Sequence, residues 1–224
     1  MKPQSNPSLL QFNWNEFVAP ARETVYWKEI YNGETIRAGF YHLKAGAIDD
    51  QTPHDYDEIY YVKKGVSKIQ VGKKSFDIRK GYIIYVQAKQ THYFHDITED
   101  LDLLVLFSKG PYDPTESIVQ IDHIEQLMLK MENSKKVQID FLEKKSMTLS
   151  LCKLPGATEN EKSLIQPFDE MNFVLNGKGS FTAGDQKIEV KAGSLFFVSK
   201  QIPHHFKTAE GIDVLILFES KSTQ

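Results

Sequence analysis

Two imidazoles and one carboxylate stand at positions from which they could hold a metal ion. His54 and Glu58 are four residues apart, and a β-rich string runs from Glu58 to Gly65. Another β-rich string opens at Gly81 and is followed, after a polar turn, by His92. Imidazole nitrogens and carboxylate oxygens bind divalent transition metals when neighbouring strands bring them together. His54, Glu58 and His92 are therefore our candidate metal ligands.

The elements that must position these residues occur twice. Landmark residues return 112 positions further along the chain, and 34 residues separate the glutamate from the last histidine in both copies. The paired residues are Glu58 and Glu170, Val62 and Val174, Gly65 and Gly177, Gly72 and Gly184, Gly81 and Gly193, and His92 and His204. Self-similarity at a fixed period indicates a duplicated architecture, which predicts two domains of roughly a hundred residues each.

Short runs of β-branched and aromatic residues, punctuated by glycine turns, fill both copies and predict a β-sandwich or β-barrel. Pro111 and Pro114 interrupt this pattern between the copies. A short amphipathic helix is predicted after them, with Asp122 as its N-cap and Glu125 as its third helical residue. We expect four parts: an apolar N-terminal arm at 1–24, a first barrel with the metal site at 25–110, a connector with the helix at 111–135, and a second barrel with a degenerate site at 136–224.

The composition narrows the classes of function. Hydrophobic residues make up 41% of the chain, and the formal net charge is −3. No half is strongly basic, so nucleic acid is not expected as a partner. No signal peptide is recognised, and no apolar stretch approaches the roughly 18 residues of a membrane span. The single cysteine, Cys152, suits a reducing compartment. We expect a cytoplasmic protein without nucleic-acid or membrane partners. The apolar arm is expected to pack across a barrel or onto a partner subunit, and the second alternative predicts a homodimer.

Both copies resemble the cupin superfamily over residues 35–107 and 147–218, so the chain is similar to a bicupin. The family's first motif is a glycine, then His-x-His, three or four residues, a glutamate, six residues and a glycine. Its second motif is a glycine, five residues, Pro-x-Gly, two residues and a histidine. The first copy matches these motifs as Gly46, Thr52-Pro53-His54, Glu58 and Gly65, and then as Gly81, Gln87-Ala88-Lys89 and His92.

The resemblance implies an all-β fold of two tandem cupin jelly-roll β-barrels of the RmlC-like type, joined by a short helix. It places metal ligands on His54, Glu58 and His92, whereas the family's first histidine falls on Thr52. A hydroxyl is a poor ligand for a late transition metal, so we expect three protein ligands and open positions for water. The resemblance permits iron, manganese, nickel or zinc as the divalent metal.

In the second copy the equivalent residues are Gln166, Glu170 and His204. They form a candidate second metal site, but an amide oxygen is a weak ligand for iron or zinc. We favour the interpretation that these three residues are a buried polar group whose hydrogen bonds hold the second barrel closed.

The candidate catalytic residues are Glu58, which could move protons, and Tyr60. Strand alternation puts Tyr60 on the same face as Glu58, where its hydroxyl could orient a substrate. Arg37 and His42 could meet an anionic substrate, but their opposite parity lets at most one of them face inward. We expect a metal-dependent enzyme for a small-molecule substrate, by dioxygenase-like oxidation or by isomerisation. The alternative is a bicupin that binds or senses a small molecule without catalysis.

Overall fold

The structure, a computed structural model, describes residues 8–17, 24–159 and 163–219. It is all-β apart from a short 3-10 helix, η1 (Trp14–Phe17), and one α-helix, α1 (Ile124–Ser134), within these residues. The chain divides into two compact units. The first barrel is Phe17–Lys130, and the second barrel combines Met1–Glu16 with Met131–Gln224. No helix in these residues has the length and apolar character needed to cross a membrane.

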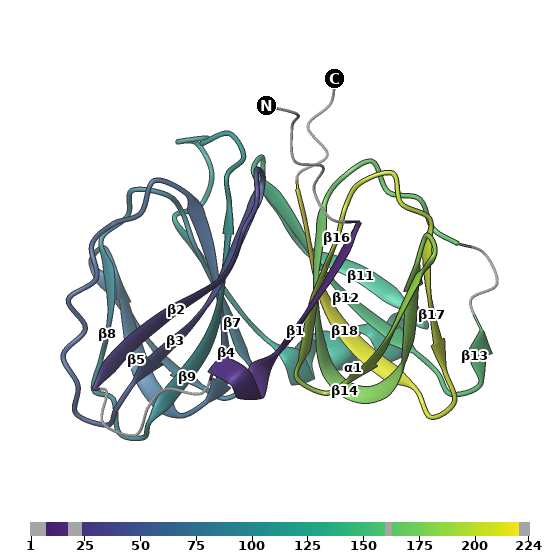
Figure 1. The fold of residues 1–224 in the computed structure, drawn as a ribbon. Helices are drawn as coiled ribbons and strands as arrows, with labels where there is room; N and C mark the ends of the chain where they lie inside the picture. Colours follow the sequence, from purple (N-terminus) through teal and green to yellow (C-terminus); the bar gives the residue numbers. More distant parts are fainter. Residues whose placement is uncertain (1–7, 18–23, 160–162, 220–224) are drawn as a thin grey trace. The chain divides into compact units, whose positions relative to one another are not determined.

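The first barrel is built from two antiparallel sheets (Figure 1). Its strands are β2 (Val25–Asn32), β3 (Ile36–Leu43), β4 (Asp57–Lys64), β5 (Val66–Val71), β6 (Lys74–Arg79), β7 (Tyr82–Val86), β8 (His92–His95), β9 (Leu101–Ser108) and β10 (Val119–His123). A six-stranded sheet has the order β10-β7-β4-β9-β3-β2, and a three-stranded sheet has the order β6-β5-β8. Because side chains alternate across each strand, one face of each sheet can point into the barrel.

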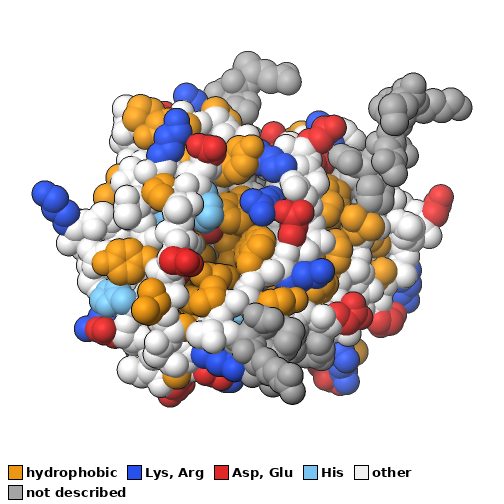
Figure 2. All heavy atoms as spheres, turned by 60° about the vertical axis from the view of Figure 1, so that its left-hand side comes forward, with side chains coloured by type: hydrophobic (Ala, Val, Ile, Leu, Met, Phe, Trp, Pro, Cys, Tyr) orange, Lys and Arg blue, Asp and Glu red, His pale blue; other side chains and the backbone are white. Residues whose placement is uncertain are grey.

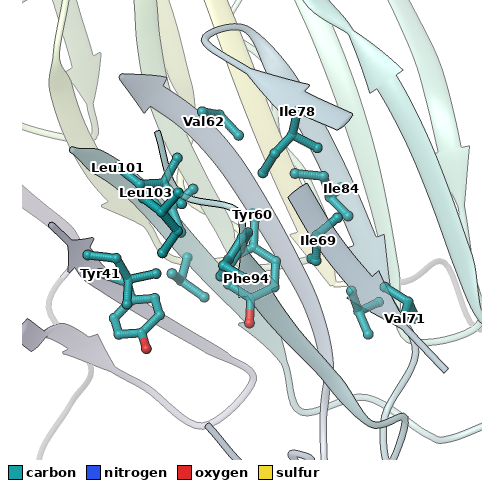
Figure 3. Packing of buried hydrophobic residues seen from close by; sticks show 14 of the residues in the cluster. Tyr41, Tyr60, Val62, Ile69, Val71, Ile78, Ile84, Phe94, Leu101 and Leu103 are labelled. Atoms are coloured by element: carbon teal, nitrogen blue, oxygen red, sulfur yellow. The ribbon is translucent and has the colours of Figure 1, made fainter. Parts of the chain in front are cut away.

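The apolar core of the first barrel comes from these inward faces (Figure 3). Tyr60 and Val62 of β4 pack with Phe94 of β8 and Leu103 of β9. Tyr60 is therefore an inward residue, as strand alternation predicts. The outward residues of β4, such as Ile59, are buried as well, so the whole strand from Asp57 to Val62 is shielded from solvent.

The second barrel repeats this plan, but its outermost strand comes from the start of the chain. Its strands are β1 (Leu9–Asn13), β11 (Gln138–Glu143), β12 (Met147–Leu154), β13 (Thr158–Glu159), β14 (Glu170–Ala183), β15 (Gln186–Lys191), β16 (Ser194–Val198), β17 (His204–Thr208) and β18 (Ile212–Glu219). The main path is β1-β16-β14-β18-β12-β11. β1 pairs with β16 in the second barrel as β10 pairs with β7 in the first.

Equivalent glycines bend the chain between the two sheets in both barrels. Gly65 follows β4 with a φ of 101°, and Gly177 lies within β14 with a φ of 83°. A side chain on Gly65 would also place its Cβ only 2.5 Å from the carbonyl oxygen of Asp100. Only glycine combines this backbone conformation with such a close approach. This requirement explains why both copies keep a glycine at this landmark position.

Helix α1 begins later than the sequence predicts, so the proposed N-cap at Asp122 is wrong. Asp122 lies in β10, which pairs with β7 as far as His123. The strand hydrogen bonds carry the extended backbone past Asp122, and the helix starts at Ile124. The cap is instead His123, whose Nδ1 lies 3.3 Å from the amide nitrogen of Glu125 and accepts its hydrogen bond.

Candidate metal centre

The first barrel brings His54, Glu58 and His92 together. Glu58 is the second residue of β4, His92 opens β8, and His54 lies in the loop before β4. One ligand atom from each residue lies within 4.8 Å of the other two. Nε2 of His92 is 3.1 Å from Oε2 of Glu58, and Nε2 of His54 is 3.8 Å from Oε1. The glutamate and His92 side chains are each 2% exposed, whereas that of His54 is 32% exposed.

The orientation of His92 is set by its other ring nitrogen. Nδ1 lies 2.8 Å from the carbonyl oxygen of Gln90. A carbonyl only accepts hydrogen bonds, so Nδ1 carries a proton and Nε2 is the nitrogen turned toward Glu58. A backbone partner of this kind is a usual support for a metal-binding histidine. His54 is placed by its ring, whose centroid lies 5.2 Å from that of Phe107 with the planes nearly perpendicular.

The charges at this cluster suit a cation. Oε2 of Glu58 is buried and lacks a well-aligned hydrogen bond among the described residues, although Nε2 of His92 lies close to it. Burial lowers the pKa of His92, but the close contact with Glu58 and the charge of that carboxylate outweigh it, so the pKa of His92 is raised. A buried carboxylate that stabilises positive charge, flanked by two imidazole nitrogens, is a donor set that fits a divalent transition metal.

Tyr60 extends the cluster into a hydrogen-bond network. Its hydroxyl oxygen lies 2.9 Å from Nε2 of His92, and the hydroxyl donates to Oε1 of Gln51 at 2.9 Å. Burial, followed by the charge of Glu58, raises the pKa of Tyr60 well above its usual value, so the hydroxyl keeps its proton. The family's first-histidine position falls on Thr52, but Thr52 is exposed and the side chain that reaches the site is that of Gln51.

Asp49 supports this network and was not predicted from the sequence. Its buried carboxylate accepts hydrogen bonds from the hydroxyl of Tyr41 at 2.7 Å, the amide of Phe94 at 2.7 Å and the side-chain amide of Gln51 at 2.8 Å. The last bond turns Oε1 of Gln51 toward Tyr60. Burial and the charge of Asp49 raise the pKa of Tyr41. Figure 3 shows the hydroxyls of Tyr41 and Tyr60 pointing to the same side of the core.

His54 and Glu58 of the cluster line a cavity of about 250 Å³ in the first barrel. The cavity is lined by aromatic, apolar and polar side chains, namely Trp27, Arg37, Tyr41, Gln51, His54, Glu58, Tyr60, Val105 and Phe107. On the face that Figure 2 brings forward, hydrophobic side chains gather beside a histidine. The alternation of side chains along β3 left open whether Arg37 or His42 faces inward, and the structure places Arg37 at the cavity. His42 instead bonds Oδ1 of Asp102 through Nδ1 at 2.7 Å.

The equivalent residues of the second barrel form a different arrangement. Nε2 of His204 lies 3.5 Å from Oε1 of Glu170. Burial raises the pKa of Glu170 to about 7 and lowers that of His204, so both residues favour their neutral forms. The carboxamide of Gln166 makes no hydrogen bond to either of them in the described structure. Asn172 stands where the first barrel has Tyr60. The hydrogen-bonded trio that we expected of Gln166, Glu170 and His204 is therefore wrong: Gln166 is only half-buried, and Oε1 of Glu170 is buried without a hydrogen-bond partner among the described residues.

Comparison with known proteins identifies the family. The sequence model of the cupin domain matches residues 39–108 and 151–218, one match in each barrel. The chain therefore belongs to the cupin domain family, and its fold is two tandem jelly-roll barrels. An uncharacterized protein of Streptomyces coelicolor is 46% identical over 73 residues, which cover 33% of this chain and 70% of that protein.

Solved structures share the fold at low sequence identity. The salicylate 1,2-dioxygenase of Pseudaminobacter salicylatoxidans is 11% identical with a TM-score of 0.77, covering 97% of this chain and 86% of that one. A variant of the oxalate decarboxylase of Bacillus subtilis is 14% identical with a TM-score of 0.67, covering 98% of this chain and 79% of that one. At these identities the likeness shows the fold alone.

Proposed function

We propose that this chain is a metal-dependent enzyme that acts on a small organic molecule in the first barrel. The observation that carries the proposal is the convergence of His54, Glu58 and His92, the first two of which line a cavity with aromatic walls. Two of the donors are buried, and a cluster of buried charge is costly unless it has a partner. The structural neighbours include a dioxygenase and a decarboxylase, which supports a catalytic role on this fold.

In this proposal His54, Glu58 and His92 hold a divalent metal such as iron, manganese, nickel or zinc. Two histidines and one carboxylate leave open positions, and with iron(II) such a site supplies the chemistry of non-haem oxygenases. Tyr60 lines the same cavity, and its hydroxyl, fixed in place by the hydrogen bond to Gln51, is the group that would orient the bound molecule. Glu58 is also the buried carboxylate placed to hold or move a proton.

Oxidation is the first candidate reaction, and the lining of the cavity favours it. Trp27, Tyr41, Val105 and Phe107 present apolar surface, which excludes water from a reacting molecule. Isomerisation is the second candidate, because Glu58 is within reach of the same space and a carboxylate can act as a general base.

The proposal is tested by loading the protein with iron(II), manganese, nickel or zinc and measuring the bound metal by elemental analysis. We expect one metal to bind per chain, with H92A and E58A losing it and H204A keeping it. H204A is a matched control, because His204 is the equivalent residue of the second barrel. Equal metal content in the wild type and H92A would refute the metal centre.

A second measurement separates catalysis from binding alone. Iron-loaded wild type is mixed with small aromatic and aliphatic acids in air, and both oxygen consumption and product formation are followed. Turnover by the wild type and none by H92A supports the enzyme. Saturable binding without consumption of oxygen or change in the added molecule supports the alternative, a bicupin that binds or senses a small molecule.

A further inference from the structure

We propose that Arg37 forms an anion-binding subsite, so that the cavity of the first barrel selects a small molecule with a carboxylate group. The inference rests on the proposed function in one respect only, namely that the other end of that molecule reacts at the metal centre. Arg37 lies on β3 and lines the same cavity as His54 and Glu58. It is the only arginine or lysine among the residues described as lining it.

The guanidinium of Arg37 is held by aromatic contacts. Its Cζ atom lies 5.4 Å from the ring centroid of Trp27 and 5.2 Å from that of Phe107. The indole of Trp27 crosses β3 above Gly39, where a Cβ atom would collide with the ring. Stacking on aromatic faces limits the motion of a guanidinium, and a group ordered in advance loses less freedom when a ligand binds.

Arg37 retains donors that no described residue uses. Its Nε donates to Oε2 of Glu29 at 2.7 Å. The two terminal nitrogens, Nη1 and Nη2, make no hydrogen bond in the described structure. The ion pair with Glu29 is partly exposed, with side chains 29% and 41% accessible, and such pairs contribute little to stability. The planar fork of N–H groups is suited to the two oxygens of a carboxylate.

The distance from Arg37 to the metal cluster suits a compact ligand. The ring of Phe107 lies 5.2 Å from Cζ of Arg37 and also 5.2 Å from the ring centroid of His54. The guanidinium and this imidazole are therefore separated by no more than twice that distance. The volume of about 250 Å³ lies below the roughly 300 Å³ at which pockets for drug-sized ligands begin.

The balance of charge favours a carboxylate over a more highly charged anion. Arg37 is a single cation, and Glu29 already neutralises part of its charge. Trp27, Tyr41 and Phe107 provide apolar surface for the body of the ligand. A monoanion with a flat apolar body, such as an aromatic carboxylate, matches both the aromatic walls and the one available fork of donors.

The test uses benzoate and its uncharged analogue benzamide. In a W14F background Trp27 is the sole tryptophan, so its fluorescence reports on ligands beside Arg37. We expect benzoate to quench Trp27 with saturation and to bind at least about tenfold more tightly than benzamide. R37Q should abolish this preference and R37K should keep part of it.

R79Q is the matched control, because Arg79 stacks in the same manner on the ring of Tyr82, and both residues are absent from the cavity lining. Absence of a saturable response to benzoate, or equal affinities in the wild type and R37Q, would overturn the subsite. Metal-free and zinc-loaded proteins are both titrated. Dependence on Arg37 in the metal-free protein supports the subsite even where the metal analysis refutes the proposed function. Metal binding without a preference for benzoate would support the proposed function and overturn the subsite.

Discussion

The hydroxyl oxygen of Tyr60 lies 2.9 Å from Nε2 of His92, the ring nitrogen that faces the candidate metal centre. The hydroxyl proton is directed away from His92, to Oε1 of Gln51. Nδ1 of the same histidine bonds the carbonyl oxygen of Gln90. Because the hydroxyl proton goes to Gln51, Tyr60 accepts a hydrogen bond from His92 when Nε2 is protonated, a form that the raised pKa of His92 favours in the metal-free protein. The loop residue Gln51 is then connected to a candidate ligand through one hydroxyl group.

Removing the hydroxyl of Tyr60 tests this connection. We expect Y60F to lower the free energy of unfolding of the metal-free first barrel by about 1–2 kcal/mol, because Gln51 and His92 each lose a buried partner. The measurement is urea unfolding followed by Trp27 fluorescence in the W14F background. Metal content should match the wild type, because His54, Glu58 and His92 are unchanged. Loss of metal from Y60F would show that Tyr60 itself helps to hold the ion.

Asp49 should contribute more to stability than any single member of the network. D49N places an amide where donors from Tyr41, Gln51 and Phe94 converge, so at least one donor loses its acceptor. We expect unfolding of the first barrel to become easier by about 2–4 kcal/mol. Asp50 is exposed, so D50N is the control and should change stability by less than about 0.5 kcal/mol. Equal effects of the two variants would contradict a supporting role for Asp49.

The cost of replacing Gly65 has two parts, backbone strain and steric collision, which can be measured separately. Gly46 has a φ of 75° with nothing within 4 Å of an added Cβ, so G46A should cost only about 1 kcal/mol of backbone strain. At Gly65 the added Cβ also meets the carbonyl oxygen of Asp100. We therefore expect G65A to cost at least about 2 kcal/mol more than G46A, measured by thermal and urea unfolding. Similar losses would show that the loop near Asp100 yields easily.

Glu170 makes the stability of the second barrel depend on pH. Its pKa is raised from 4.5 to about 7 by burial, so the folded state holds the proton more tightly than the unfolded chain does. This stabilisation is complete below the unfolded pKa and is lost as the pH rises through about 7. E170Q cannot ionise, and it should remove up to about 3 kcal/mol of the fall in stability between about pH 5 and pH 8.

That pH dependence is measured by urea unfolding in a W27F background, in which Trp14 is the sole tryptophan. Trp14 is buried in the second barrel, 5.9 Å from the ring of Phe173. The exposed Glu189 provides the control, because E189Q should leave the pH profile of the wild type unchanged. A profile of E170Q that overlays the wild type would show that Glu170 ionises normally in the folded protein.

Several features of the site depended on the tertiary structure. Gln51, rather than Thr52, reaches Tyr60, because the loop before β4 has no regular period from which side-chain direction could be predicted. Asp49 lies in the same loop, and its importance comes from partners on three separate segments. Arg37 and His42 point to opposite faces of β3, but the alternation of side chains alone does not tell which face meets the cavity.

The sequence by itself determined the duplication, the all-β character, the placement of Tyr60 on the same face as Glu58 and the choice of His54, Glu58 and His92 as candidate ligands. These follow from local periodicity and from a repeated spacing, which persist whatever surrounds them. Only the tertiary structure decided that Leu9–Asn13 completes the second barrel by pairing with Ser194–Val198, and that Arg37 shares a cavity with the histidines. Such relationships join segments far apart along the chain, and they are selected by the packing and hydrogen bonding of the whole barrel.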